Sequence, residues 1–291
     1  MSVVLITGAG SGLGLEGALA FARNGDTVYA SMRDRARAGS LLDAAADENL
    51  RLEVIELDVT CADTFAGVIE SIVGTAGRLD VLVNNAGIIR PGALEDISEK
   101  DLRAVIDTNM VGPLLLARAV LPQMRAQRGG CIIMMSSLSG IAGLPGDLAY
   151  TASKFGLEGA TEALRHEVDR FGIRVALVEG GMYATGIFEA SLDNEGLFPP
   201  NYPDDSPYRP FVEDRLRAVR RSLERAFHPR LVGELYVRIA GSDGSRLRWP
   251  ADKVAETVLG KMWAQDDAAR DAFLREVAGT DWWSEGRDHA E

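Results

Sequence analysis

Short apolar runs alternate with longer segments of helical periodicity over the first 180 residues of the chain. The runs are nearly continuous in apolar residues, which is typical of parallel strands covered on both faces. They lie at 3–6, 27–31, 52–57, 79–83, 130–135 and 173–178. Segments with the spacing of helices separate them, at 12–24, 62–76, 99–127 and 151–171.

This order predicts an α/β fold with a doubly wound parallel sheet of Rossmann type, right-handed crossovers and helices on both faces. In such a sheet ligands bind beyond the carboxyl ends of the strands, so the segments that follow the runs are where a site is expected. With 291 residues, of which 46% are apolar, the chain suffices for one large domain with an insertion. We therefore predict a single domain over 1–291.

The charge and the composition of the chain limit the kinds of partner and the location that we expect. The net charge of −12 argues against nucleic acid or an anionic membrane as the main partner. No signal peptide is expected, because the stretch "SVVLI" that contains the first run starts at Ser2. The most apolar stretch, "MVGPLLLARAVLP", is too short and too broken to span a bilayer. Cys61 and Cys131 lack metal-ligand spacing, so we predict no metal site and reduced thiols in a cytoplasmic protein, the alternative being a disulfide between the two.

The pattern changes after residue 185, and we predict that 186–250 is an insertion that covers the substrate. Residues 194–210 contain five prolines and predict a loop. Residues 211–227 carry apolar side chains at helical spacing, which fits either a helix lying on the domain or a lid over a pocket. Farther on, "DAFLREVAG" at 271–279 is interpreted as a last strand.

The first run leads into a glycine-rich turn, "TGAGSGLG", at residues 7–14. Its glycines allow a sharp turn and a close approach to a ligand, and the helix that follows points free N–H groups at a phosphate. No lysine follows the last glycine, so the turn is not a P-loop. Leu13 stands where G-x-G-x-x-G needs its third glycine, so it is not that motif either.

The end of the second run bears on which dinucleotide would bind. In folds of this kind an acid about 20 residues after the glycines binds the ribose of NAD, whereas an arginine there accommodates the phosphate of NADP. Here Met32 stands at the acid position, Arg33 follows it, and Asp34 comes two residues later. This order favours NADP(H), and the alternative is that Arg33 is a solvated surface charge.

Two later runs also end in polar residues. "NNAG" at 84–87 follows the fourth run and "SSLSG" at 136–140 follows the fifth, although such residues are also common in turns and caps. Tyr150 comes thirteen residues after Ser137, and Lys154 follows four residues later. One helical turn would bring the ammonium near the phenol, and a nearby cation lowers the pKa of a tyrosine from about 10 toward the range of general acid–base catalysis.

In combination, "TGAGSGLG", "NNAG", "SS" before "LSG" and "YTASK" resemble the short-chain dehydrogenase/reductase family, in its simple single-domain branch. The resemblance runs from residue 2 to about residue 185. It implies that Tyr150 passes a proton to or from the substrate oxygen, which Ser137 holds by a hydrogen bond. It also implies that Lys154 binds the nicotinamide ribose and lowers the pKa of Tyr150, and that Asn109 anchors a water-mediated proton relay.

The resemblance further implies that Asp58, with Val59 beside it, contacts adenine, and that Thr185 contacts the nicotinamide carboxamide. The whole predicted cofactor-binding set is Gly8, Ser11, Gly12, Leu13, Gly14, Arg33, Asp58, Val59, Asn85, Ala86, Gly87, Tyr150, Lys154 and Thr185. One departure is visible, because Gly180-Gly181 stands where the family usually has Pro-Gly. The missing proline is expected to loosen the backbone near the nicotinamide.

We therefore expect an NADP(H)-dependent oxidoreductase that interconverts a secondary alcohol and a ketone on a small-molecule substrate. Three alternatives stay open: the same reaction with NAD(H), an epimerisation or dehydration on the same scaffold, and a protein that binds NADP(H) without turning it over. The resemblance also leads us to expect a homo-oligomer, either a dimer or a tetramer.

The segment 186–250 indicates the size of the substrate, because it holds Leu197, Phe198, Tyr202, Tyr208 and Phe211. Within the family, "VYASMRD", "ASKFGLEG" and the long C-terminal segment are similar to hydroxysteroid and retinol dehydrogenases. We expect a bulky, largely apolar substrate, and the alternative is that these side chains only pack the insertion.

Overall fold

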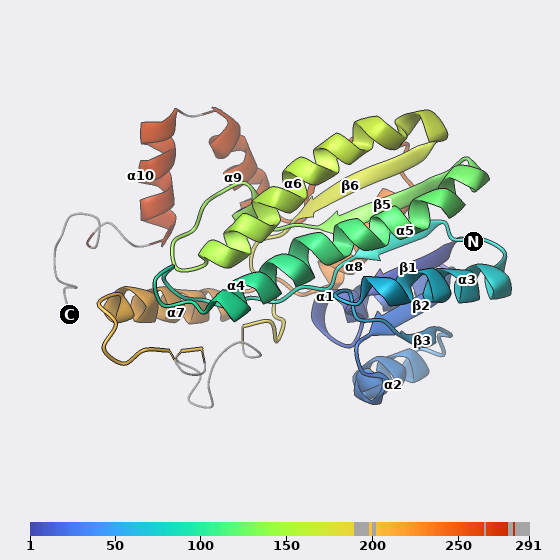
Figure 1. Ribbon diagram of the computed structural model, residues 1–291, viewed down its shortest axis with the longest axis horizontal. Coiled ribbons are helices and arrows are strands. Elements are labelled where there is room, and N and C mark those ends of the chain that lie inside the picture. Colours follow the sequence, from blue (N-terminus) through green and yellow to red (C-terminus); the bar gives the residue numbers. More distant parts are fainter. Residues whose placement is uncertain (189–197, 200–201, 265, 279–281, 283–291) are drawn as a thin grey trace.

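Seven parallel strands form one sheet in the computed structural model, which describes residues 1–188, 198–199, 202–264, 266–278 and 282. The strands lie in the order β3-β2-β1-β4-β5-β6-β7 (Figure 1). Their bounds are β1 Val3–Thr7, β2 Thr27–Met32, β3 Glu53–Glu56, β4 Val81–Asn84, β5 Gly130–Met135, β6 Ile173–Glu179 and β7 Arg248–Pro250. The strand order reverses between β1 and β4, and at such a point a crevice forms beyond the strand ends.

Helices cover both faces of the sheet. The long helices are α1 Gly12–Arg23, α2 Gly39–Asp47, α3 Phe65–Ala76, α4 Glu99–Ile106, α5 Gly112–Gln127, α6 Leu148–Val168, α7 Arg209–Leu223, α8 Arg230–Ala240, α9 Lys253–Ala264 and α10 Asp267–Ala278. One face packs against α1, α2 and α8, and the other packs against α3, α5 and α6. Figure 1 shows α7, α9 and α10 at the end of the sheet opposite the N-terminus. The predicted doubly wound α/β fold is therefore confirmed.

Each strand supplies both cores because successive side chains point to opposite faces. In β1, for example, Val4 and Ile6 belong to the core under α1 and α8, whereas Val3 and Leu5 belong to the core under α3 and α5. All four are at most 4% exposed. This double burial explains why the strands are nearly continuous in apolar residues.

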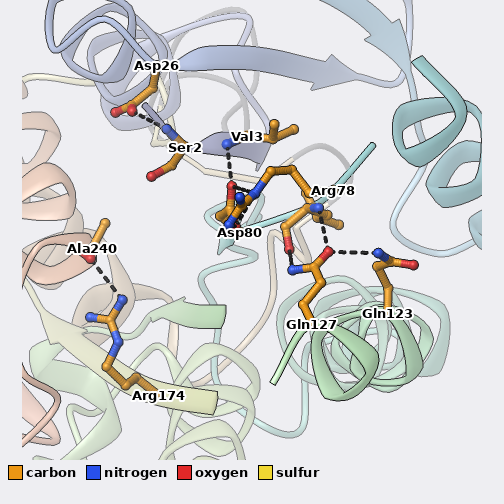
Figure 2. Close-up of polar contacts among 10 residues, drawn as sticks. Ser2, Val3, Asp26, Arg78, Asp80, Gln123, Gln127, Arg174 and Ala240 are labelled. Atoms are coloured by element: carbon orange, nitrogen blue, oxygen red, sulfur yellow. Dashed lines mark hydrogen bonds and ion pairs between the residues drawn. The ribbon is translucent and has the colours of Figure 1, made fainter. Parts of the chain in front are cut away.

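The amino end of the sheet is held by polar side chains, shown in Figure 2. Asp80, directly before β4, accepts the Val3 N–H at 2.8 Å and is also paired with Arg78 at 2.6 Å. Asp26 accepts the Ser2 N–H at 2.7 Å, and Gln127 at the end of α5 accepts the Leu79 N–H at 2.9 Å. These contacts fix where the strands begin, so the polar groups at this end of the sheet have a structural role.

The C-terminal part contains both expected and unexpected elements. Among the described residues of 186–250, α7 lies at the carboxyl end of the sheet (Figure 1), whereas α8 packs in the core and β7 extends the sheet. The interpretation of 271–279 as a strand is wrong, since residues up to Ala278 belong to α10. Phe273 and Leu274 of that helix pack beside α9 around Val258 and Met262, so their apolar character serves a helix contact.

One helical run, Glu99–Gln127, is long and apolar enough to cross a membrane by length and composition alone. It consists of α4, a π-helical turn at Asp107–Val111 and α5, and is longer than the apolar stretch considered in the sequence. Leu116, Val120 and Met124 of this run are fully buried in the core beneath the sheet. The apolar character of the run is therefore accounted for by packing against the sheet.

Candidate active site

The turn after β1 requires glycine at three positions. Gly8 and Gly12 have φ of 68° and 55°, in the left-handed region that favours glycine. A Cβ on Gly8 would lie 2.9 Å from the Ala86 Cα, and one on Gly14 would lie 2.3 Å from the Gly8 carbonyl oxygen. A Cβ on Gly10 would meet nothing closer than 3.8 Å. The turn thus forms a tight cradle, in which Gly8, Gly12 and Gly14 cannot be replaced by a larger residue without a clash or backbone strain.

A hydrogen-bond network ties this turn to the end of β4. Thr7 accepts the N–H groups of both Asn85 and Ala86 at 3.0 Å through its hydroxyl. The Asn85 amide donates to the Thr7 carbonyl at 2.9 Å, and the Tyr236 hydroxyl of α8 donates to the Asn85 Oδ1 at 3.1 Å. The sequence did not single out Thr7 or Tyr236. Both are positioning residues that hold the two sides of the crevice together.

The N-terminus of α1 completes the cradle. Ser11 is the N-cap of the helix and is exposed, with no cap hydrogen bond from its side chain, and Leu13 lies in the first turn. Thr185, from the loop after β6, lies over the turn, since its Cγ2 would be 2.9 Å from a Cβ on Gly12. A helix start behind a glycine turn is suited to a phosphate group, so these residues fit a dinucleotide.

The end of β2 carries the residues expected to determine whether the protein prefers NADP or NAD. The Met32 sulfur lies 3.8 Å from the Cβ position of Gly10, so Met32 lies beside the glycine turn. The Asp34 carboxylate accepts the Ala36 N–H at 2.9 Å and caps the turn that follows. Arg33 is exposed between them at the strand end. Asp34 is thus occupied by its own turn, whereas Arg33 faces solvent beside the cradle.

Asp58 and Val59 lie just after β3 in the loop that leads to α3. Asp58 accepts the N–H and the hydroxyl of Thr60 at 2.9 and 2.7 Å, which fixes the conformation of the loop. Val59 is buried, and its carbonyl oxygen would lie 2.3 Å from a Cβ on Gly112. The loop is therefore held against the start of α5, on the same side of the sheet as the ends of β1 and β4.

Ser137, Tyr150 and Lys154 meet beyond the end of β5. Tyr150 lies in the first turn of α6, and Lys154 lies one turn later on the same helix. The Lys154 Nζ is buried and donates to the Met135 carbonyl at 2.7 Å, while it lies 5.6 Å from the centre of the Tyr150 ring. The Ser137 hydroxyl forms a hydrogen bond that favours the Tyr150 phenolate. The predicted trio is thus brought together.

The proton affinities differ from the prediction. Burial raises the pKa of Tyr150 to about 12, and the hydrogen bond from Ser137 only partly offsets it. Burial lowers the pKa of Lys154 to about 8. The pKa of Tyr150 thus moves opposite to the expected lowering, because desolvation of the phenol dominates and the nearby Asp147 charge adds to the rise. Near neutral pH Tyr150 is a protonated acid.

Asn109 lies in the π-helical turn between α4 and α5 and is fully buried. Its amide accepts the Ile88 N–H and donates to the Ile88 carbonyl, both at 2.8 Å. It also donates to the Ser153 hydroxyl at 3.2 Å, and Ser153 donates to the Tyr150 carbonyl at 2.7 Å. Such turns are frequent at functional sites. Asn109 thereby connects the loop after Gly87 to the first turn of α6, through a serine that the sequence did not single out.

A pocket opens at the N-terminus of α6, one turn before Tyr150. Its walls are largely apolar, with Asp147 and Arg215 as the charged members. The lining residues are Pro91, Pro145, Gly146, Asp147, Phe188, Val212, Arg215, Leu216 and Val219. Val212, Leu216 and Val219 come from α7, so this helix both packs on the fold and forms a wall of the pocket.

The described aromatic residues predicted near the substrate, Phe198, Tyr202, Tyr208 and Phe211, belong to one apolar cluster. Phe198 and Phe211 are buried with Val212 and Leu216, and Tyr202 stacks on Phe198 with 5.1 Å between ring centres. These side chains therefore pack the segment around α7. Leu197 lies outside the described residues.

The loop after β6 contains the departure from the family pattern. The Gly181 N–H donates to the Asp252 carboxylate at 3.0 Å, and the Tyr183 hydroxyl donates to the same oxygen at 2.8 Å. The Ala184 N–H donates to the Phe227 carbonyl at 3.0 Å. These bonds hold the path that leads to Thr185, so the backbone is fixed here without the proline.

Comparison with known proteins agrees with this geometry. A family model described as short chain dehydrogenase matches residues 2–196. The 3-ketodihydrosphingosine reductase of Bacteroides thetaiotaomicron is 32% identical over 268 residues, which is 91% of this chain and 94% of the relative. Retinol dehydrogenase 8 of Bos taurus is 38% identical over 254 residues, 84% of this chain and 80% of the relative.

Solved structures also match. A short-chain dehydrogenase from Streptomyces avermitilis superposes with a TM-score of 0.74 at 30% identity and covers 99% of this chain and 98% of its own. A metagenomic short-chain oxidoreductase in complex with NADP has a TM-score of 0.66 at 26% identity, over 86% of this chain and 95% of its own. Both similarities extend well beyond the segment that carries the motifs.

Proposed function

The chain belongs to the short-chain dehydrogenase family, as an oxidoreductase that acts on CH–OH groups, and we propose that it interconverts a secondary alcohol and a ketone with NADP(H). The observation that carries the proposal is the convergence of Ser137, Tyr150 and Lys154 beyond β5, beside the glycine cradle. A protein that only bound the dinucleotide would need no proton donor there.

The residues divide the work of ketone reduction. NADPH supplies the hydride when it is bound. The Tyr150 hydroxyl, protonated near neutral pH, gives its proton to the substrate oxygen as negative charge develops there. The Ser137 hydroxyl donates a hydrogen bond to the same oxygen, and such a donor stabilises the developing alkoxide. Asn109 and Ser153 hold the first turn of α6 in place.

The protonation state of Lys154 sets the alkaline limit. Its ammonium favours the phenolate that Tyr150 becomes after proton transfer, and its pKa of about 8 is far below that of Tyr150. As the pH rises, Lys154 therefore loses its charge first. We expect the rate of ketone reduction to fall above about pH 8, as the pH passes the Lys154 pKa.

The cofactor assignment rests on the end of β2. Met32 leaves no carboxylate for a ribose hydroxyl, and Asp34 is held by its own turn, whereas the Arg33 guanidinium is free to face a phosphate. The NADP bound to a relative of similar fold supports the same choice. The test compares KM for NADPH and NADH in wild type and in Arg33→Ala. A loss confined to NADPH is expected, and equal KM values for both cofactors in the wild type would refute the assignment.

The substrate that we propose is bulky and largely apolar. The pocket before Tyr150 is lined in part by Pro91, Val212, Leu216 and Val219, and the last three come from α7. Two relatives named for retinol and for 3-ketodihydrosphingosine support the same class. We also propose that α7, with the described residues 202–208 directly before it, forms the part of 186–250 that covers the substrate within a single domain. Activity confined to small polar ketones would refute the substrate class.

One screen separates the remaining alternatives. Ketones and alcohols of graded size are offered with NADPH, NADP⁺, NADH and NAD⁺, and the nicotinamide absorbance is followed. Net oxidation of NADPH by ketones is expected. An epimerase or dehydratase would convert substrate without net change of added NADPH, and a sensing protein would bind NADPH without converting anything.

We also propose a homo-oligomer, a dimer or a tetramer, in the cytoplasm. Leu148 and Phe155 of α6 are 43% and 41% exposed, and large apolar groups on a helix face suit a subunit contact. Cys61 and Cys131 are both free thiols, which suits a reducing compartment. Light scattering of the purified protein tests the assembly, and a monomer at micromolar concentration would refute it.

A further inference from the structure

One helical turn beyond Lys154, two glutamates lie in a buried cluster with one arginine. Glu158 of α6 is 4% exposed, and Glu179 at the end of β6 is fully buried. The Arg248 Nε, from β7, lies 3.1 Å from a Glu158 oxygen and 3.8 Å from a Glu179 oxygen. The three side chains thus converge from a helix and two adjacent strands.

The cluster packs against the residues that carry the catalytic groups. A Cβ on Gly140 would lie 2.6 Å from the Ser136 Oγ and 2.9 Å from the Glu158 Cγ, so these two groups meet at Gly140. The Lys154 Nζ binds the carbonyl of Met135, the residue before Ser136. Glu158 is therefore near enough to Lys154 for its charge to favour the ammonium.

The charges do not balance if both glutamates are ionised. Arg248 also binds Glu162 at 2.8 Å on the solvent side, so one guanidinium faces three carboxyls. Against this excess of carboxyls stand only a few hydrogen bonds among the described residues, from Ser136 to Glu158 and from the backbone of Glu179 and Trp249 to Glu179. Two buried carboxylates this close repel each other and lose hydration, so the pair favours binding one proton. In agreement, burial and the Glu158 charge raise the pKa of Glu179 to about 8.

Among the described residues, Lys154 is the further cation that faces the pair. It comes from α6 together with Glu162, and η4, at Leu138–Gly140, brings no titratable group. Beyond Arg248, α9 places only the Trp263 ring against the guanidinium, at 5.2 Å. The nearby Asp252 is occupied by the Gly181 N–H and the Tyr183 hydroxyl.

We propose that Glu158 and Glu179 are a buried carboxyl pair that holds one proton at neutral pH and keeps the Lys154 ammonium charged. They are positioning residues for Lys154, and the proposal rests on the proposed function only for the role of that lysine. With one proton, the pair and Arg248 carry no net charge. When that proton passes to solvent at higher pH, the cluster becomes negative beside Lys154, which then keeps its own proton longer.

The test is the pH profile of kcat for ketone reduction in Glu158→Gln and Glu179→Gln, with Glu162→Gln as the matched control. Glu162 binds the same arginine but is about half exposed. We expect the alkaline limb to move to lower pH by about one unit in the first two variants and to stay in place in the third. Profiles of Glu158→Gln and Glu179→Gln that superimpose on the wild type would overturn the proposal.

A second readout does not depend on activity. Between about pH 5 and 8 the folded chain holds a proton on Glu179 that the unfolded chain has released, so stability falls as the pH rises through this range. Glu179→Gln should remove that part of the slope of Tm against pH, and also the protonated-carboxyl band in infrared difference spectra. If these changes are seen in a protein that turns over no ketone, the pair stands and the proposed function fails. An unchanged slope and band would overturn the pair, whatever the activity.

Discussion

Adding one methyl group to the glycine cradle should impair the enzyme at Gly14, where there is no room for a Cβ, and should be tolerated at Gly10. In Gly14→Ala the new Cβ would lie 2.3 Å from the Gly8 carbonyl oxygen and 2.5 Å from the Asn85 amide nitrogen. Both contacts are about 1 Å shorter than van der Waals distance. Neither neighbour can turn away, because the oxygen belongs to the backbone and the amide is bonded to the Thr7 carbonyl.

The start of α1 must therefore move by about 1 Å relative to β4. A displacement of that size at a positioned site costs about 100-fold in rate, so we expect kcat/KM for NADPH to fall by about that factor. Overpacking of this kind should also lower the free energy of unfolding by about 1–3 kcal/mol. Steady-state kinetics, NADPH titration and thermal melts measure the three quantities.

Gly10→Ala is the matched control in the same turn, because its Cβ meets nothing closer than 3.8 Å and its φ is not in the left-handed region. The affinity of Gly10→Ala for NADPH should stay within about threefold of the wild type, a much smaller change than the one expected for Gly14→Ala. If Gly14→Ala bound NADPH like the wild type, or if Gly10→Ala lost affinity equally, the account of the cradle would be refuted.

Three further predictions concern residues around the cradle. Arg33→Ala should raise KM for NADPH by about tenfold, the worth of one charge-assisted contact, and leave KM for NADH unchanged; equal effects on both cofactors would contradict it. Tyr236→Phe, which removes the bond to Asn85, should lower the free energy of unfolding by about 1 kcal/mol in a denaturant titration, and an unchanged midpoint would contradict it. Val212→Asp, which places a carboxylate in the apolar pocket, should raise KM for a bulky ketone by at least about tenfold while NADPH binding stays intact, and an unaltered KM would show that α7 does not contact the substrate.

The sequence predicted the fold well where the strands are buried on both faces, because such strands are apolar throughout. It missed β7, which has three residues, and α2, whose nine residues bury only Leu41 and Ala45. It misread α10 because Phe273 and Leu274 are adjacent apolar residues, and only their packing beside α9 identifies them as a helical face.

The sequence predicted that Ser137, Tyr150 and Lys154 lie together, because these residues follow a strand end or share a helical turn. Thr7 and Tyr236 were not predicted, because Tyr236 reaches Asn85 across 151 positions of the chain and no local pattern records that contact. The raised pKa of Tyr150 was missed for a similar reason, since burial depends on many distant residues while the Lys154 spacing is visible locally. The carboxyl pair likewise forms only when β6, β7 and α6 come together.

The measurement that tests the central proposal most directly is NADPH oxidation by a bulky ketone in wild type and in Tyr150→Phe. The variant loses only the hydroxyl that gives the proton, so its turnover should fall by at least about 100-fold, the contribution expected of a general acid. Its NADPH affinity, measured by fluorescence titration, should stay within about threefold, because a rate loss that leaves binding intact is one made in the transition state. Turnover of the variant at the wild-type rate would contradict the assignment of Tyr150 and, with it, the proposed reaction.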